Sequence, residues 1–193
     1  MMSRAIGILG GTFDPVHFGH LIAASWALDE LALDRILLIP NSQSPLKTPG
    51  PTASFADRVA MVACAITSES RLTVSDVEGR RGGVSYTVDT LQQVRAEYPD
   101  AQLSLILGTD ALQDFVSWRD HTTVAEIARI VGVVRGDEDA PLPSVVQHVL
   151  SMPRIDISSS LIRQRIAAGQ TIAFLTPSTV VAYIREHRLY GSP

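Results

Sequence analysis

The chain has 193 residues, of which 46% are hydrophobic and 19% are charged. This composition is typical of a soluble protein that buries one core, and it excludes disorder as the default state. The formal charge is −4 and the basic residues are scattered, so a nucleic-acid partner is disfavoured. Small anions remain compatible with this charge, because a few local donors are enough to bind them.

Cysteine content and hydropathy indicate where the protein works. The single cysteine, Cys64, cannot form an internal disulfide or a multi-thiolate zinc site. The apolar stretches are far shorter than the roughly 20 residues that span a bilayer, and the N-terminus lacks a signal-peptide core. We therefore expect a cytoplasmic protein that contacts no membrane. A homo-oligomer is an alternative that the sequence leaves open.

Short apolar runs alternate with segments of helical periodicity in chain order. We expect strands at 5–9, 35–39, 72–77, 103–107 and 130–134, and helices at 20–31, 54–67, 88–98, 159–168 and 177–187, with shorter helices after Asp110 and at 124–128. This alternation predicts an α/β fold in which residues 1–193 form a single Rossmann-like domain, an open parallel sheet flanked by helices. Ligands of such sheets bind beyond the C-terminal ends of the strands. The polar segment 135–143 is expected to be a flexible insertion.

The stretch from Gly10 to His20, GGTFDPVHFGH, lies between the first predicted strand and the first predicted helix. Phosphates bind at this position in parallel α/β folds, because backbone N–H groups point toward the anion. Two imidazoles three residues apart on one helix face can donate further hydrogen bonds to phosphate oxygens. Each histidine alone is typical of a cap or a core residue, but the cluster as a whole favours a phosphate site. It matches neither the G-x-G-x-x-G fingerprint nor a P-loop.

Within this stretch, His17-Phe18-Gly19-His20 resembles the (T/H)-x-G-H signature of the nucleotidyltransferase superfamily. Members of that superfamily transfer a nucleotidyl group from a nucleoside triphosphate to a phosphate or an alcohol. The resemblance implies that His17 and His20 contact the phosphates of the triphosphate and the transition state, and that Gly19 leaves room for the nucleotide. We assign the neighbouring residues Gly10, Gly11, Thr12 and Phe13 to ATP binding.

A second anion site is predicted at 157–163, ISSSLIR, where hydroxyls and N–H groups at a helix start precede an arginine. An isolated run of serines before a helix is simply a good cap. The segment resembles the I-S-S-T-x-I-R motif, which grips the triphosphate of ATP, with Ser160 in place of threonine. The resemblance assigns Ser158, Ser159, Ser160 and Arg163 to ATP, and implies that the C-terminal helical part, about 157–193, completes the ATP site.

Features in the middle of the chain resemble bacterial nicotinate-nucleotide adenylyltransferases. Residues 82–91, GGVSYTVDTL, are similar to their G-x-S-Y-T-x-D-T-L segment, 107–110 are similar to their I-G-x-D turn, and Trp118 follows at the family's spacing. The resemblance assigns Tyr86, Thr87 and Trp118 to the nicotinate substrate, and Gly108 and Asp110 to ATP. Each of three residues also has a purely structural alternative: Thr87 as a helix N-cap, Trp118 as a core aromatic residue and Asp110 as an acidic helix cap.

The loop after the second predicted strand supplies the remaining assigned residues. Residues 40–47 read PNSQSPLK, where the family commonly has P-N-x-x-P-P-H-K with a lysine that reaches phosphate. The resemblance assigns Lys47 to catalysis and Asn41 and Ser42 to substrate binding. Leu46 replaces the usual histidine, and Arg119 stands where many relatives have a second aromatic residue. The chain also closes on 188–190, RLY, the family's usual ending.

The resemblance implies adenylyl transfer from ATP to nicotinate mononucleotide, giving nicotinate adenine dinucleotide and pyrophosphate in NAD biosynthesis. The residues assigned to catalysis are His17, His20, Lys47 and Arg163. Mg²⁺ is expected to arrive with ATP and to have no protein ligands, because the sequence lacks a cluster of carboxylates. Two alternatives stay open: another member of the superfamily, such as a phosphopantetheine adenylyltransferase, and a non-catalytic nucleotide-binding regulator.

Overall fold

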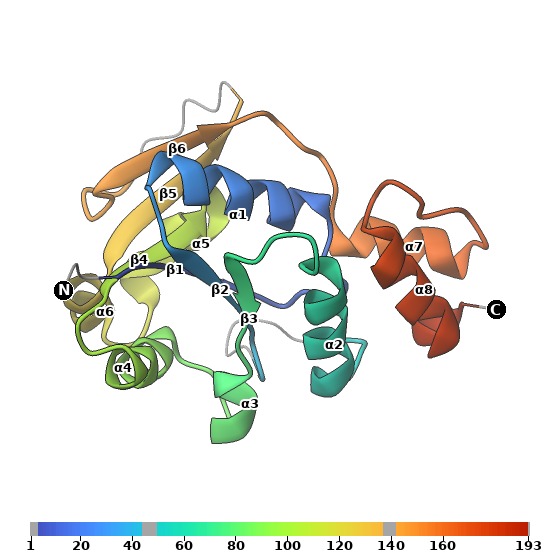
Figure 1. Cartoon of the computed structure of the whole chain (residues 1–193), viewed down its shortest axis with the longest axis horizontal. Helices are drawn as coiled ribbons and strands as arrows, with labels where there is room; N and C mark the ends of the chain where they lie inside the picture. Colours follow the sequence, from blue (N-terminus) through green and yellow to red (C-terminus); the bar gives the residue numbers. More distant parts are fainter. Residues whose placement is uncertain (1–3, 44–49, 137–141, 193) are drawn as a thin grey trace.

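A computed structural model describes residues 4–43, 50–136 and 142–192. Parallel strands form one sheet in the order β3-β2-β1-β4-β5-β6 (Figure 1). Their bounds are β1 (Ala5–Gly11), β2 (Arg35–Pro40), β3 (Leu72–Val74), β4 (Gln102–Gly108), β5 (Arg129–Arg135) and β6 (His148–Met152). The predicted open parallel sheet is confirmed.

Helices cover both faces of this sheet. Their bounds are α1 (Phe18–Glu30), α2 (Phe55–Ala65), α3 (Val77–Arg81), α4 (Thr87–Glu97), α5 (Thr109–Gln113), α6 (His121–Ile127), α7 (Ser159–Ala167) and α8 (Ser178–Glu186), with 3₁₀ turns η1 (Phe115–Ser117) and η2 (Leu189–Gly191). Helices α1, α2, α7 and α8 contribute to the core on one face, and α3 to α6 contribute to the core on the other. Burial on both faces explains why the strands are apolar runs without alternation.

The register of the strands shows how these cores form. Ile8 of β1 lies opposite Leu37 of β2 and Leu105 of β4, and all three belong to the core beneath α4 and α6. The next residue of β2, Leu38, belongs to the opposite core beneath α1 and α2. Successive side chains of a strand point to opposite faces, so each strand supplies both cores.

Two elements, β6 and α3, were not predicted from the sequence. In β6 the residues alternate in burial, with Leu150 and Met152 in the core and their neighbours more exposed, as expected of an edge strand covered on one face. Helix α3 has five residues, too few to show helical periodicity, and it begins where the third strand was expected to end. Residues 137–141 of the predicted insertion lie outside the described residues.

Helix α8 packs against α2, and α7 lies at the same C-terminal side of the molecule (Figure 1). Ile162 of α7 and Val180 of α8 are fully buried in the same core as Met61 of α2. The Thr179 hydroxyl also donates to the carbonyl of Cys64 at 2.8 Å. The predicted C-terminal helices therefore pack against the body of the domain rather than extend from it.

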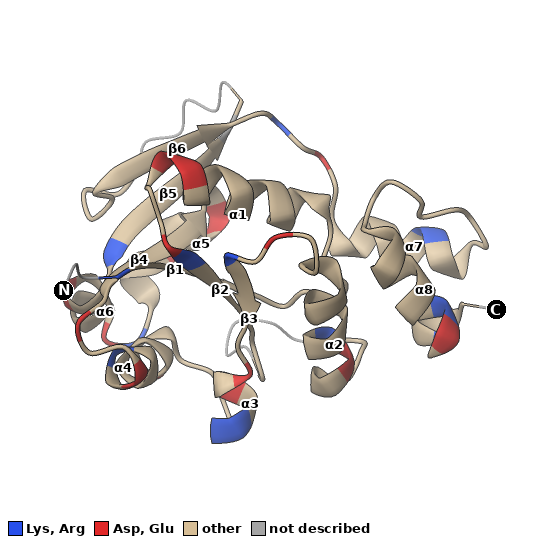
Figure 2. Cartoon of the chain, in the orientation of Figure 1, with Lys and Arg blue, Asp and Glu red and all other residues tan. Residues whose placement is uncertain are grey.

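Charged residues of both signs are spread over the molecule (Figure 2). Among the described residues, no helix has the length and hydropathy needed to cross a bilayer.

Candidate active site

The order of the strands locates the candidate site. Strand β2 lies on one side of β1 and β4 on the other, so the connections diverge between β1 and β4, where ligands of such sheets bind beyond the C-terminal ends. Strand β1 ends in Gly10 and Gly11, and β4 ends in Gly108. A Cβ atom built at Gly10 or Gly108 meets no atom of the described residues within 4 Å. Both strand ends therefore border open space at the switch point of the sheet.

His17 and His20 lie together at the N-terminus of α1, directly after this glycine turn. Their rings stack with centroids 3.7 Å apart, and Phe13 contacts the His20 ring edge-on at 4.9 Å. His17 is the N-cap of α1 and is 7% exposed, and its backbone N–H donates to Nδ1 of His20 at 3.2 Å. This contact belongs to the first turn of the helix, which explains why α1 begins at Phe18 rather than at the predicted residue 20.

Gly19 lies between the two histidines, and its missing side chain leaves space for the ring of His17. A Cβ atom at Gly19 would lie 3.1 Å from Cε1 and Nδ1 of His17, and 3.7 Å from the carbonyl oxygen of Ile157. The resemblance implied that this glycine leaves room for the nucleotide. In the structure, a side chain at this position would crowd the adjacent imidazole, and the start of the serine motif lies close to it.

Asp14 lies in the same turn and was not singled out from the sequence. Asp14 is 3% exposed as a residue, and its carboxylate accepts hydrogen bonds from the N–H groups of Thr52 and Ala53, at 2.8 and 3.0 Å, and from the hydroxyl of Tyr190 at 2.8 Å. Burial, reinforced by the bond to Asp14, raises the pKa of Tyr190. Asp14 therefore joins the turn to the segment before α2 and to the C-terminal 3₁₀ turn η2.

Arg58 of α2 is a second residue that sequence reasoning missed. It is 1% exposed, and its guanidinium donates to the carbonyl of Thr12 at 2.8 Å and, over longer distances, to Asn41 Oδ1 and the carbonyl of Ser42. Burial lowers the pKa of Arg58, and the charge of Asp14 opposes this shift. An arginine remains protonated in proteins, so Arg58 is a buried cation that joins the glycine turn to the loop after β2.

The serine motif and Arg163 contact the turn from the C-terminal side. Ser158 is the N-cap of α7 and accepts from the N–H of Leu161, as expected of a cap, while Ser159 Oγ donates to the carbonyl of Pro15 at 2.8 Å. Arg163 donates to the carbonyl of Asp14 at 2.7 Å and to Ser160 Oγ at 3.3 Å. The structure thus brings the second predicted anion site against the first.

The predicted substrate residues after β2 are held by the segment before α4. Ser85 Oγ accepts from the N–H groups of Ser42 and Gln43, at 3.1 and 3.4 Å. The buried carboxylate of Glu78 accepts from the N–H of Ser42 at 3.2 Å and from the Thr90 hydroxyl at 2.8 Å. Hydrogen bonds therefore run from the glycine turn through Arg58 and this loop to the residue that precedes Tyr86.

The predicted nicotinate residues lie around the start of α4. Tyr86 is the N-cap of α4 and Thr87 is its first residue, so the alternative of Thr87 as the N-cap is wrong. Trp118 packs against Phe115 with ring centroids 5.5 Å apart, and its buried indole nitrogen has no hydrogen-bond partner among the described residues. Arg119 lies over the Tyr86 ring, 4.8 Å from its centroid.

The remaining predicted residues are placed as follows. Asp110 lies exposed in the first turn of α5, whose N-cap is Gly108, as expected of an acidic residue near a helix N-terminus. Lys47 and Leu46 lie outside the described residues. Among the described residues, no group of three or more histidine, cysteine, aspartate or glutamate side chains could hold a metal ion.

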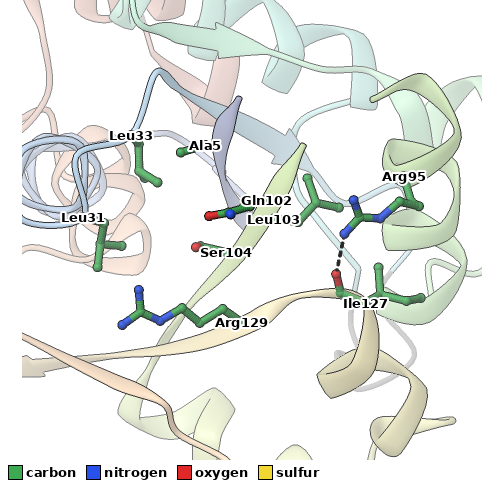
Figure 3. A pocket seen from close by; sticks show the side chains of 9 residues that line it. All are labelled: Ala5, Leu31, Leu33, Arg95, Gln102, Leu103, Ser104, Ile127 and Arg129. Carbon is green, nitrogen blue, oxygen red and sulfur yellow. Dashed lines mark hydrogen bonds between the residues drawn. The ribbon is translucent and has the colours of Figure 1, made fainter. Parts of the chain in front are cut away.

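A cavity of about 310 Å³ lies at the opposite end of the strands from the candidate site (Figure 3). It is lined by the first residues of β1, β4 and β5, including Ala5, Gln102 and Arg129. Arg95 also lines it and donates to the carbonyl of Ile127 at 2.9 Å. None of the predicted site residues lines this cavity, which borders the N-terminal ends of the strands.

The chain is similar to known proteins in its sequence and in its fold. The cytidylyltransferase-like family model matches residues 8–165. A relative from Synechococcus sp. (strain JA-3-3Ab), described as a probable nicotinate-nucleotide adenylyltransferase, is 43% identical over 98% of this chain and 96% of its own length. One from Thermus thermophilus with the same description is 41% identical over 96% of this chain and 98% of its own.

Solved structures share the fold. Plasmodium falciparum nicotinic acid mononucleotide adenylyltransferase complexed with NaAD matches with a TM-score of 0.82 and 19% identity, and the match covers 98% of both chains. The same enzyme complexed with APC matches with a TM-score of 0.80. At this sequence identity, the likeness concerns the fold alone.

Proposed function

The chain belongs to the cytidylyltransferase-like family and, within it, to the nicotinate-nucleotide adenylyltransferases, and from this we propose that it transfers the adenylyl group of ATP to nicotinate mononucleotide. The products are nicotinate adenine dinucleotide and pyrophosphate, and the reaction is a step of NAD biosynthesis. The structural observation that carries the proposal is the stacked pair of His17 and His20 behind the glycine turn.

The reaction needs no covalent intermediate on the protein. A phosphate oxygen of the mononucleotide attacks the α-phosphorus of ATP, the bond from that phosphorus to the bridging oxygen breaks, and the electron pair leaves with pyrophosphate. The attacking phosphate is already ionised at neutral pH, so no general base has to remove a proton. Catalysis then depends on positioning the two phosphates and stabilising the charge that moves onto the leaving group.

We assign the α-phosphate and the bridging region to His17 and His20. The geometry supports this role because both rings lie at the N-terminus of α1, where the helix dipole favours an anion. Nδ1 of His20 accepts from a backbone N–H, so a neutral His20 carries its proton on Nε2 and can donate it in a hydrogen bond to a phosphate oxygen.

We assign the β- and γ-phosphates to Arg163 and to Ser158, Ser159 and Ser160, so that the C-terminal part of the chain completes the ATP site. The hydrogen bonds of Ser159 and Arg163 to the carbonyls of Pro15 and Asp14, just before the two histidines, support this proposal. Lys47 is proposed to contact the incoming phosphate or the triphosphate. The other residues proposed to border ATP are Gly10, Gly11, Thr12, Phe13, Gly19, Gly108 and Asp110.

We assign the nicotinate mononucleotide to the start of α4 and the loop after β2. Thr87 lies in the first turn of α4, so its hydroxyl and nearby N–H groups can receive the carboxylate, and an indole such as Trp118 can stack on the flat pyridine ring. Tyr86, Asn41 and Ser42 complete this proposed substrate site.

Adenylyl transfer from ATP uses a divalent cation, and we propose Mg²⁺. The described residues contain no cluster of side chains that would hold it, so we assign it to the triphosphate and name no protein ligand. We further propose that the enzyme works in the cytoplasm without a nucleic-acid or membrane partner, in keeping with its net charge of −4. A measurement of its mass in solution tests the alternative of a homo-oligomer.

Pyrophosphate release tests this function directly. We expect release from ATP with nicotinate mononucleotide, and much slower release with the nicotinamide form or with no acceptor. His20→Ala should lose a transition-state phosphate contact and with it about 10²–10³ in rate, whereas His187→Ala, at the exposed end of α8, should not. ATP binding without pyrophosphate release in the presence of any mononucleotide would instead support a non-catalytic regulator.

A further inference from the structure

The carboxylate of Asp14 is the point where three separate segments of the chain meet. It accepts from Thr52 and Ala53 before α2 and from the Tyr190 hydroxyl of η2. A buried carboxylate is costly unless donors surround it, and these three bonds supply them. None of these partners is assigned to a substrate.

Arg163 adds a fourth contact and connects this junction to ATP. Its Nη1 atom donates to the carbonyl oxygen of Asp14 at 2.7 Å and lies 3.8 Å from the carboxylate oxygen Oδ2. The side chain of Arg163 is 31% exposed, whereas that of Asp14 is 4% exposed. The guanidinium is thus held beside a buried anion while part of it stays exposed, so a bound triphosphate would compete with Asp14 for it.

The Tyr190 hydroxyl influences this competition. It donates to Oδ1 of Asp14 at 2.8 Å and so disperses part of the carboxylate charge. Burial and the neighbouring charge of Asp14 raise the pKa of Tyr190, so the hydroxyl keeps its proton and remains a donor at neutral pH. Without it, Asp14 would have one donor fewer and would attract Arg163 more strongly.

We propose that Tyr190 is a positioning residue for ATP: by donating to the buried Asp14 carboxylate, it leaves Arg163 available to the triphosphate. The proposal rests on the proposed function in that it uses the assignment of Arg163 to ATP. It gives the C-terminal 3₁₀ turn a role in affinity for ATP rather than only in folding.

The chain offers a matched control for this test. The hydroxyl of Tyr183 in α8 donates to Asp57 in α2 at 3.0 Å. This Tyr–Asp bond also joins the C-terminal part of the chain to the rest of the domain, but it does not touch Asp14. Tyr190→Phe and Tyr183→Phe each remove one hydroxyl and one Tyr–Asp hydrogen bond. A role limited to fastening the C-terminal part of the chain would lower the stability of the variants and leave their ATP affinities equal.

Two measurements on the full chain distinguish the variants. We expect Tyr190→Phe to weaken ATP binding by about three- to tenfold, measured by calorimetry without acceptor. A tenfold loss of affinity corresponds to only part of the free energy of one charge-assisted hydrogen bond. The KM for ATP should rise in the same ratio, while the KM for nicotinate mononucleotide stays within about twofold of wild type. Tyr183→Phe should keep wild-type values for both substrates.

Equal ATP affinity in Tyr190→Phe and wild type would overturn the proposal, as would the same loss in both variants. A rise in both KM values in Tyr190→Phe would also overturn it, because it would indicate general distortion of the site. Failure of the wild type to release pyrophosphate would count against the proposed function alone, since the calorimetric comparison needs only ATP.

Discussion

The backbone N–H of His17 donates to Nδ1 of His20 at 3.2 Å, so one proposed catalytic histidine sets the tautomer of the other. The carbonyl of the same peptide unit, at Val16, accepts from the buried hydroxyl of Thr176 at 2.8 Å. Because a peptide unit is planar, anchoring its oxygen also sets the direction of its N–H. The C-terminal part of the chain thereby orients His20 through one peptide plane.

This relationship predicts different outcomes for two substitutions of His20. Asparagine places a polar atom near the position of Nδ1 and can still accept from His17, but it lacks a donor near Nε2. We expect His20→Asn to lose about 10²–10³ in kcat with little change in thermal unfolding. Glutamine restores a donor near Nε2, so His20→Gln should retain more activity but be less stable. Pyrophosphate release and unfolding midpoints test this, and the reverse order of activities would contradict it.

The sequence predicted the strands that are buried on both faces, because such strands are continuous apolar runs. Residues 36–39 of β2, for example, are all buried, and neighbours along the strand supply opposite cores. Strand β6 was not predicted, because its core residues Leu150 and Met152 alternate with more exposed ones in a segment of only five residues. Short edge elements carry too little pattern to be distinguished from loops.

The sequence predicted residues that belong to local motifs, such as His17 and His20, but missed residues whose partners are distant. Asp14 and Arg58 bind backbone groups of residues 38 and 46 positions away, respectively, and nothing local marks such pairs. One signal was available for Arg58. It shares the buried face of α2 with Met61, Val62 and Ala65, at helical spacing. A charge on a core-facing position indicates a buried polar partner.

Gly19→Ala should lower activity more than stability. The added Cβ atom would lie 3.1 Å from the His17 ring, and the ring must move to accommodate it. Alanine is preferred over glycine in a helix by roughly 0.5–1 kcal/mol, which offsets the strain, so we expect nearly unchanged unfolding. Displacing a proposed catalytic ring by a fraction of an ångström should cost about tenfold or more in kcat.

Gly50→Ala is the matched control for this substitution. A Cβ atom at Gly50 meets none of the described residues within 4 Å, so the kcat of Gly50→Ala should equal that of wild type. Full activity in Gly19→Ala would show that the His17 ring is not held in place by this contact.

Arg119→Met should reduce the preference for the nicotinate over the nicotinamide substrate. Arg119 pairs with Asp89 of α4 at 3.6 Å and lies over Tyr86, next to the proposed carboxylate site at Thr87. Without the guanidinium, the Asp89 charge would be unbalanced near the nicotinate carboxylate, and we expect the KM for that substrate alone to rise by about two- to fivefold.

Arg154→Met provides the control for Arg119→Met, because Arg154 also forms an Arg–Asp pair, with Asp156 at 3.0 Å, on the exposed surface. Its KM values for both mononucleotides should match wild type. A parallel rise for the acid and the amide in Arg119→Met would contradict a role for its charge and would indicate a displaced Trp118.

Arg58→Met should destabilise the fold. It removes donors from the carbonyl of Thr12 and from Asn41, and it removes the buried cation near the carboxylates of Asp14 and Glu78. Breaking such a buried charged contact costs about 3–5 kcal/mol of unfolding free energy, which urea titration would measure. A loss below about 1 kcal/mol would mean that neighbouring groups replace these contacts.

The hydrogen bonds of Asp57 lead us to expect a pH-dependent difference in stability between the wild type and a variant at this position. It is the third residue of α2, where it accepts from the hydroxyls of Ser54 at 2.6 Å and Tyr183 at 3.0 Å. The pKa of Asp57 is lowered from its usual value of 3.8, mainly by the hydrogen bond from Ser54. The hydrogen bond from Tyr183 and the nearby charge of His187 lower this pKa further. A carboxylate with a lowered pKa stabilises the fold above the unfolded value, and this contribution disappears as the pH falls through the folded value.

Asp57→Asn should therefore be less stable than wild type at pH 7, by about 0.5–2 kcal/mol, the usual cost of losing a helix-capping contact. The difference should persist at pH 5, where Asp57 is ionised in both folded and unfolded chains, and shrink below about pH 4 as the wild-type carboxylate becomes protonated. Urea unfolding of both proteins at pH 7, 5 and 3 measures it. A difference that stays constant down to pH 3 would show that the ionised carboxylate is not what Ser54 and Tyr183 stabilise.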